Sequence, residues 1–258
     1  MCGGLNGAGT TTDVIWRIDP AIGRATTLGH LAAAVHDAGG AALGSTGLVL
    51  GGGRSGPGTV VQSVGAAGTS ALTGRLPVAR ADLVAVSVGG QVLVVGGGTP
   101  ARYDLSVLAT ADGRHFRKVA SLQQGVRYPA VAALDGRIYV VGGSTPSGDT
   151  RDIQVVDPAS GSVIVAGRLP FGLSHASAFV VGGELLVAGG RRAGLAQSAV
   201  WRLQIGANGL VSAIPIGRLP YPVSDAAAVV LNRTGYLLGG EGARVGVPLD
   251  TVISLAWR

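Results

Sequence analysis

A set of polar residues recurs at one fixed distance before the Gly-Gly doublets of this sequence. Each member stands 14 positions ahead of the first glycine of a doublet, and the set comprises Asp37, Asp82, Tyr128, His175 and Asp225. Carboxylate, imidazole and phenol groups can exchange hydrogen bonds with a polar ligand, and an imidazole beside a carboxylate can also move a proton. The shared register predicts that the fold brings these side chains to one face.

Further polar side chains accompany this set. Two of its members are directly preceded by His36 and Arg127, and the loops after the doublets contribute Arg54, Arg102, Arg191 and Arg244. An arginine rim around carboxylates and a histidine suits an acidic sugar or a peptide carboxylate, which arginine binds in a bidentate manner. A second interpretation stays open, since short polar residues at such places also bind the backbone amides of the turn that leads into a strand.

Composition limits the classes of function. The sequence has 258 residues, 45 of them glycine, and a net charge of +6 in which Lys118 is the sole lysine. The arginines are scattered singly, without the basic clusters and interleaved aromatic residues of a nucleic-acid face, so nucleic acid is not an expected partner. The four histidines lack metal-ligand spacing, and neither a phosphate-binding glycine loop nor a nucleophile elbow is found. These motifs therefore predict no catalytic residues, no metal and no other cofactor.

The opening residues and the longest uncharged segment bear on localisation. Residues 1–9 have neither a basic nor an apolar leader region, so no secretory signal is expected here, and export would require a leader upstream. No charged residue occurs from Leu83 to Ala101, but Gly89-Gly90 interrupts this run where the other copies also have a turn. Two buried strands joined by a tight turn explain the pattern, and no membrane span is predicted.

The elements that must carry these residues form a repeat. Gly-Gly doublets end apolar runs at intervals of 48, 45, 46, 47 and 50 residues, beginning at Gly3, Gly51, Gly96, Gly142, Gly189 and Gly239. The tetrapeptide GRLP starts 22 residues before three of them, at Gly74, Gly167 and Gly217. Each period reads as four short strands: two apolar runs around a turn, a third run after the doublet loop, and a fourth that ends near the next GRLP.

Four antiparallel strands, repeated about every 47 residues, predict the blades of a β-propeller. The doublets after an apolar second strand, together with Asp-Pro turns at Asp19 and Asp157, make the sequence resemble the Kelch family over essentially its whole length. The resemblance implies an all-β, Kelch-type propeller in one domain, residues 1–258. Six blade positions are expected, with the closing blade incomplete; five closed blades are the alternative. The arginines of GRLP are predicted to hold the junctions between blades.

The resemblance also implies a function. A non-catalytic binding or scaffold role is expected, with a protein or a carbohydrate, such as an acidic sugar, held on one face of the propeller. The alternative is a sugar mutarotase similar to N-acetylneuraminate epimerase, in which His175 and nearby carboxylates would assist ring opening by proton transfer. Aromatic residues typical of Kelch repeats are replaced by aliphatic ones, such as Ile18 and Val156. The binding residues of animal Kelch proteins therefore do not carry over.

Overall fold

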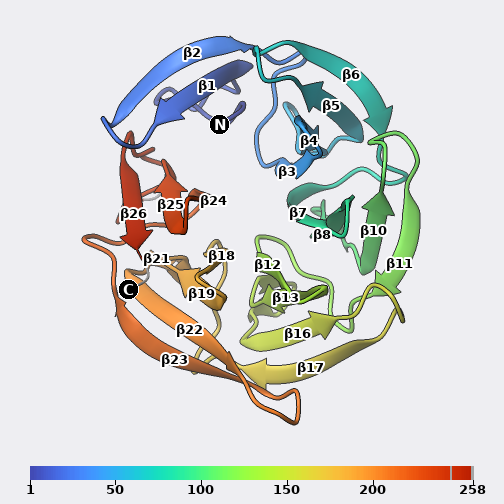
Figure 1. The fold of residues 1–258 in the computed structure, drawn as a ribbon, viewed down its shortest axis with the longest axis vertical. Coiled ribbons are helices and arrows are strands. Elements are labelled where there is room, and N and C mark those ends of the chain that lie inside the picture. The colour runs from blue at the N-terminus through green and yellow to red at the C-terminus, as the bar shows by residue number, and fades with distance from the viewer. Residues whose placement is uncertain (245, 257–258) are drawn as a thin grey trace. The chain divides into compact units, whose positions relative to one another are not determined.

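The computed structural model describes residues 1–244 and 246–256. These residues form strands, turns and loops without a helix, and they divide into two compact units, Met1–Val119 and Ala120–Arg258. The strands form small sheets whose members largely follow one another along the chain (Figure 1). The prediction of an all-β fold is confirmed.

The first unit contains one partial blade and two complete ones. In the partial blade, Cys2 bridges to Ile15 of β1 (Val14–Asp19), which pairs with β2 (Arg24–His30). The first complete blade has the strand order β3 (Gly39–Leu43), β4 (Thr46–Leu50), β5 (Val60–Val64) and β6 (Ser70–Arg75). The second has the order β7 (Ala81–Val88), β8 (Gln91–Thr99), β10 (Ser106–Thr110) and β11 (Arg117–Ser121), and β9 (Arg102–Tyr103) pairs with the end of β8.

The second unit contains two complete blades followed by a three-stranded one. The complete blades are β12 (Ala130–Leu134), β13 (Arg137–Val141), β16 (Asp152–Val156) and β17 (Val163–Arg168), then β18 (Ser177–Val181), β19 (Glu184–Ala188), β22 (Ala199–Ile205) and β23 (Val211–Arg218). The three-stranded blade is β24 (Ala227–Leu231), β25 (Thr234–Leu238) and β26 (Val252–Ala256). Two short hairpins form in the doublet loops: β14 (Ser144–Thr145) with β15 (Gly148–Asp149), and β20 (Arg191–Arg192) with β21 (Leu195–Ala196).

The blade pattern matches the sequence prediction. The uncharged segment forms β7 and β8, which pair antiparallel around Gly89-Gly90 with φ of 56° and 76° at the two glycines. Glycine takes such positive φ values without steric cost, as this tight hairpin turn requires. Six groups of strands accompany the six doublets, and among the described residues the first group lacks a first-and-second-strand hairpin and the last lacks a fourth strand. No helix in the described part of the chain is long and apolar enough to cross a membrane.

Most of the doublets touch the next blade, and this contact explains why glycine recurs there. The first glycine has a positive φ, between 61° and 66° at Gly51, Gly142 and Gly189. A Cβ at Gly142 would overlap the carbonyl oxygen of Leu173 in the following blade. A Cβ at Gly189 would likewise overlap the carbonyl oxygen of Val223 in the blade that follows its own. The second glycine donates its N–H to that same carbonyl, with a distance of 2.8 Å from Gly143 to Leu173. Only glycine meets both the conformational and the spatial demand.

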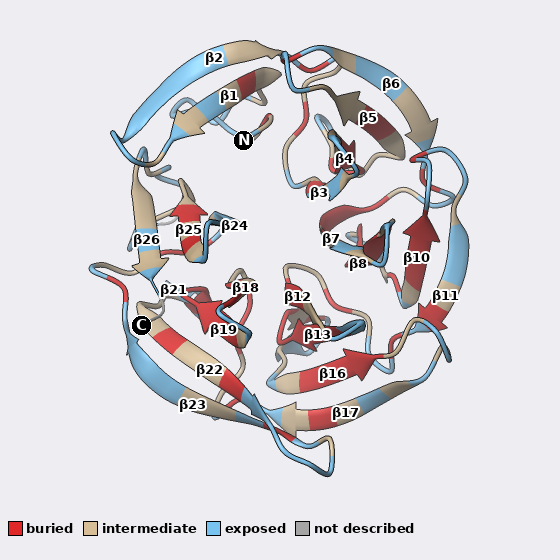
Figure 2. Ribbon diagram, in the orientation of Figure 1, coloured by how far each residue is buried: buried red, intermediate tan, exposed pale blue. Residues whose placement is uncertain are grey.

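The GRLP motif contributes its leucine to the hydrophobic core, and the side chain of its arginine forms hydrogen bonds within the blade. Its leucines are buried, with exposed fractions of 2% at Leu76 and Leu169, and they join apolar clusters that extend over neighbouring blades. Figure 2 shows buried residues gathered on strands such as β8, β10 and β16, while the fourth strands are largely exposed. The side chains of the GRLP arginines form their hydrogen bonds within their own blades and not across the junctions: Arg168 Nε donates to Asp152 Oδ1 at 2.8 Å, because the two residues are cross-strand partners in β16 and β17.

Candidate functional site

The five polar residues of the fixed register share one backbone conformation. Asp37, Asp82, Tyr128, His175 and Asp225 all have a left-handed φ, between 52° and 60°. Side chains adopt this region rarely, and non-glycine residues held there concentrate at functional sites. Within each unit the backbone joins neighbouring members: Asp82 N–H donates to Asp37 O, and in the second unit each N–H of His175 and Asp225 donates to the member before it, all at 2.9 Å. The column therefore sets side chains of adjacent blades next to one another.

In the second unit, the column brings a histidine onto an aspartate. His175 Nδ1 lies 2.6 Å from Asp225 Oδ1, and both side chains are mostly covered, with exposed fractions of 20% and 29%. The two residues are 50 positions apart in sequence and come from adjacent blades. Because the carboxylate accepts from Nδ1–H, the imidazole presents Nε2 as its remaining hydrogen-bonding atom.

Arg191 completes this network from the doublet loop. Its guanidinium lies 3.3 Å from Asp225 Oδ2, donates to Ser224 Oγ at 3.1 Å, and forms an ion pair with Glu241. Glu241 in turn accepts the N–H of Gly246 at 2.9 Å. Arg191 is only 8% exposed, so its charge is balanced inside the network by two carboxylates. It does not serve as a free rim cation, and its position orients Asp225 instead.

Aromatic stacking holds the histidine from the other side. The ring of Tyr128 stacks on the imidazole of His175, with centroids 3.8 Å apart and planes 20° apart. The guanidinium of Arg127 lies 5.5 Å from the centroid of the Tyr128 ring. Stacking and the Asp225 hydrogen bond together restrict the imidazole to one orientation. A pre-oriented group of this kind is what a binding or proton-transfer site needs.

The electrostatics of Asp225 keep it charged. Burial by itself raises the pKa of this carboxyl, but the hydrogen bond from His175 and the positive charges of His175 and Arg191 outweigh burial. The pKa of Asp225 is therefore lower than its ordinary value. An ionised carboxylate here accepts hydrogen bonds only, which fixes the proton of the shared contact on the histidine.

The first unit places its candidates in a simpler arrangement. His36 Nδ1 lies 2.8 Å from Thr11 Oγ1, and its Nε2 lies 3.7 Å from Asp37 Oδ2. Asp82 is buried, with 4% of its surface exposed. Arg54 lines a groove of about 700 Å³ in company with Thr11.

The remaining two arginine candidates stand apart from these clusters. Arg102 is largely exposed, and its guanidinium lies 4.0 Å from Asp104. Arg244 is exposed in the last doublet loop. Among the described residues, no group of three or more histidine, cysteine or acidic side chains is arranged to hold a metal ion.

Glu241 is one of the polar residues that the sequence places in the doublet loops, and its position follows from the register. The residue two positions after the first glycine of a doublet bridges to the residue before the column: His36 with Gly53, Ser174 with Arg191, and Ser224 with Glu241. Thr11 is a partner that the sequence analysis missed. Thr11 lies outside any repeated position, and its contact with His36 depends on the tertiary fold alone.

Comparisons with known proteins agree with this architecture. A family profile described as Kelch motif matches residues 126–168, the segment that includes Arg127 and Tyr128. A solved structure titled "Structure of YjhT" superimposes with a TM-score of 0.76 over 99% of this chain and 94% of that one, at 14% sequence identity. A search of curated proteins finds no significant match. At this identity the likeness concerns the fold alone.

Proposed function

Because the chain is a Kelch-type β-propeller, we propose that it is a binding module whose ligand is a carbohydrate, held at the network of His175, Asp225, Arg191 and Glu241. Sugar hydroxyls need donors and acceptors side by side, and this network contains both: carboxylate oxygens and the imidazole Nε2 that accept, and guanidinium groups that donate. The observation that carries the proposal is the pre-oriented His175–Asp225 pair, packed on Tyr128.

The charge of the network supports a limited preference for acidic sugars. Arg191 is already neutralised by Asp225 and Glu241, so it contributes little attraction for an anion. Arg127, whose guanidinium lies 5.5 Å from the centroid of the Tyr128 ring, is a second arginine of this cluster, and a guanidinium is the group that suits a sugar carboxylate. We therefore place the carboxylate of an acidic sugar against Arg127 and its hydroxyls against Asp225 and His175.

A direct binding test follows. Saturation-transfer NMR and calorimetry with N-acetylneuraminate, glucuronate and neutral monosaccharides are expected to detect binding that the combined Arg127→Ala and His175→Ala substitutions abolish. His30→Ala is the matched control, since His30 also pairs with an aspartate, at 3.0 Å from Asp13, but belongs to the exposed edge of the first unit. Undiminished binding in the double variant would remove this network as the site.

The same geometry favours a second candidate, a sugar mutarotase. Ring opening of a cyclic hemiacetal requires removal of the anomeric hydroxyl proton and delivery of a proton to the ring oxygen as the C–O bond breaks; ring closure on the opposite face reverses both transfers. An imidazole oriented through Nδ1 by Asp225 offers Nε2 for such transfers. Anomer interconversion of N-acetylneuraminate, followed by NMR, is the test. A rate equal to that in buffer eliminates this candidate and leaves the binding proposal intact.

A further inference from the structure

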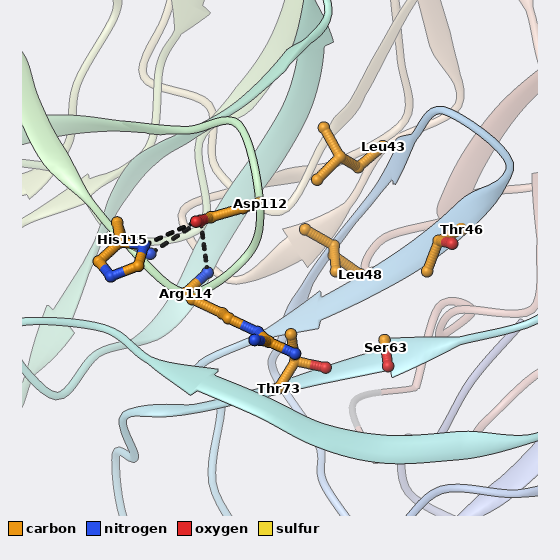
Figure 3. Close-up of a pocket in the computed structure, with 8 residues that line it drawn as sticks. All are labelled: Leu43, Thr46, Leu48, Ser63, Thr73, Asp112, Arg114 and His115. Carbon is orange, nitrogen blue, oxygen red and sulfur yellow. Dashed lines mark hydrogen bonds and ion pairs between the residues drawn. The ribbon is translucent and has the colours of Figure 1, made fainter.

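A hollow of about 450 Å³ opens in the first unit, and none of its lining residues belongs to the polar column (Figure 3). It lies where the turn between β10 and β11 meets strands β4, β5 and β6 of the preceding blade. This volume is within the range of small-molecule sites. Its walls combine three hydroxyl side chains, one guanidinium, one imidazole, two leucines and the carboxylate of Asp112.

The hydroxyls come from three neighbouring strands and face the same hollow. Ser63 is the cross-strand partner of Leu48, and Thr46 lies two positions from Leu48, so alternation along the strands sets all three on one face. Thr73 is the extra residue of a β-bulge, since the pairing of β5 with β6 shifts there by one position. Thr46 and Ser63 have no hydrogen-bond partner for their hydroxyls among the described residues, and Thr73 uses its own in a 3.3 Å bond to Ala71 O.

The turn that closes the hollow is rigid. Asp112 Oδ1 accepts the backbone N–H groups of Arg114 and His115, both at 2.8 Å, and Asp112 Oδ2 lies 2.6 Å from His115 Nδ1. The hydrogen bonds from His115 and Arg114 hold the pKa of the Asp112 carboxyl well below its usual range. With its carboxylate satisfied inside the turn, Asp112 orients the imidazole and leaves Nε2 for another contact.

Close backbone packing holds this turn against the neighbouring blade. A Cβ at Gly74 of β6 would overlap the carbonyl oxygen of Gly113, and one at Gly113 would stand 3.2 Å from the side chain of Leu48. The turn therefore packs closely against the strands that carry the hydroxyls. The hollow is a preformed site, which lowers the cost of binding.

Arg114 gives the hollow its positive charge. Figure 3 shows its side chain running from the turn across the hollow toward Thr73. Its guanidinium has no side-chain or backbone partner among the described residues, and it is exposed. A guanidinium without a partner, beside hydroxyls that are not hydrogen-bonded, offers paired N–H donors whose geometry fits an oxyanion.

The hydroxyl set is not a requirement of the blade. The position of Ser63, opposite Leu48, is occupied in the two complete blades of the second unit by Val155, opposite Tyr139, and by Arg202, opposite Leu186. Blades therefore fold without a hydroxyl at this place. The hydroxyl of Ser63 is therefore not demanded by the blade architecture.

We propose that the hollow binds the phosphate or sulfate group of a small organic molecule. The tetrahedral anion accepts hydrogen bonds from Arg114 and from the hydroxyls of Ser63 and Thr46, while Leu43 and Leu48 contact the apolar part of the ligand. Three terminal oxygens on the anion match donors that converge from the strands on one side and from the turn on the other.

The probes are phenyl phosphate, phenyl sulfate, benzoate and phenol, titrated into the full chain by NMR and calorimetry. Phenyl phosphate or phenyl sulfate is expected to bind at least tenfold more tightly than phenol, and the tighter of the two identifies the anion. Binding of benzoate or phenol as tight as that of both tetrahedral anions would overturn the proposal, and so would failure of both anions to bind.

Two variants locate the site. Arg114→Gln is expected to weaken phenyl phosphate binding at least tenfold and Ser63→Ala about threefold, in line with the loss of a charge-assisted and a neutral hydrogen bond. Arg24→Gln, which removes the same charge from an exposed position on β2, is the control and is expected to change binding less than twofold. Equal losses in the Arg24 and Arg114 variants would mean that net charge alone attracts the probe, and the proposed site would be refuted. Arg114 is exposed, so an unchanged urea midpoint is expected to verify its fold.

Discussion

The buried ion pair between Arg80 and Asp104 tests how the second complete blade is held together. The side chain of Arg80 is fully buried and that of Asp104 is 3% exposed, with Nη2 and Oδ2 3.1 Å apart. Arg80 also donates to Ser106 Oγ at 2.9 Å and to Gly96 O at 3.2 Å, and Asp104 Oδ1 accepts the Ser106 N–H at 2.9 Å. The pair thus ties β8 to the start of β10.

Replacing one partner leaves the other charge buried without its counter-ion. Removal of one member of a buried pair costs about 3–5 kcal/mol of folding free energy, so Asp104→Leu is expected to be destabilising by that amount. Replacing both, Arg80→Met with Asp104→Leu, removes both desolvation penalties and is expected to restore stability to within about 1–2 kcal/mol of wild type. If each single variant costs about 3–5 kcal/mol and the double variant about 1–2 kcal/mol, the double-mutant cycle predicts a coupling free energy of at least about 4 kcal/mol.

Urea unfolding, followed by circular dichroism for wild type, the two single variants and the double variant, measures these free energies. The reasoning is refuted if Asp104→Leu costs less than about 1 kcal/mol. It is also refuted if the two single costs simply add in the double variant, because an additive result means that the charges do not interact.

Three further predictions concern the repeat and the site. Gly142→Ala is expected to lower the free energy of unfolding by several kcal/mol, since φ is 61° and the new Cβ overlaps a carbonyl oxygen of the next blade. Gly136→Ala is the control, because φ is 75° there but no atom lies near the new Cβ, and it is expected to cost about 1 kcal/mol. Urea unfolding measures both. Gln154→Leu is expected to cost about 2–3 kcal/mol, because this buried amide accepts two loop N–H groups at 2.8 and 3.1 Å, and a melting temperature equal to wild type would contradict it. The pKa of Asp225 is lowered by folding, so its contribution to stability is complete above the unfolded value of about 3.9 and is lost as the pH falls through the folded value. Unfolding midpoints from about pH 6 to about pH 2 are therefore expected to fall less steeply in Asp225→Asn than in wild type, and parallel curves would contradict the shift.

The spacing of motifs in the sequence predicted much of the fold, because the contacts that repeat from blade to blade are made by the backbone. The doublet at Gly142 recurs because it meets the carbonyl oxygen of the next blade, and this demand is the same at Gly51 and Gly189. The column that includes His175 and Asp225 was predicted for the same reason, since its left-handed φ and its blade-to-blade hydrogen bonds repeat with the period.

The spacing of residues in the sequence did not predict which side chains pair with one another. The register indicated an arginine at position 191 but not that it turns inward between Asp225 and Glu241, and GRLP arginines such as Arg168 bind within their blade. Arg80 showed no pattern at all, although it is among the most deeply buried side chains of the chain. Such contacts depend on rotamers and on non-repeated neighbours at one junction.

The sequence by itself determined the period, the four-stranded unit, the glycine contacts between blades and the register of the polar column, because each depends on backbone geometry that every copy must satisfy. Only the tertiary structure decided which side chains meet. It paired His175 with Asp225, enclosed Arg80 with Asp104, and brought Arg114 to the hydroxyls of an adjacent blade. Residues brought together from different blades interact through distances of a few ångströms that no one-dimensional spacing specifies.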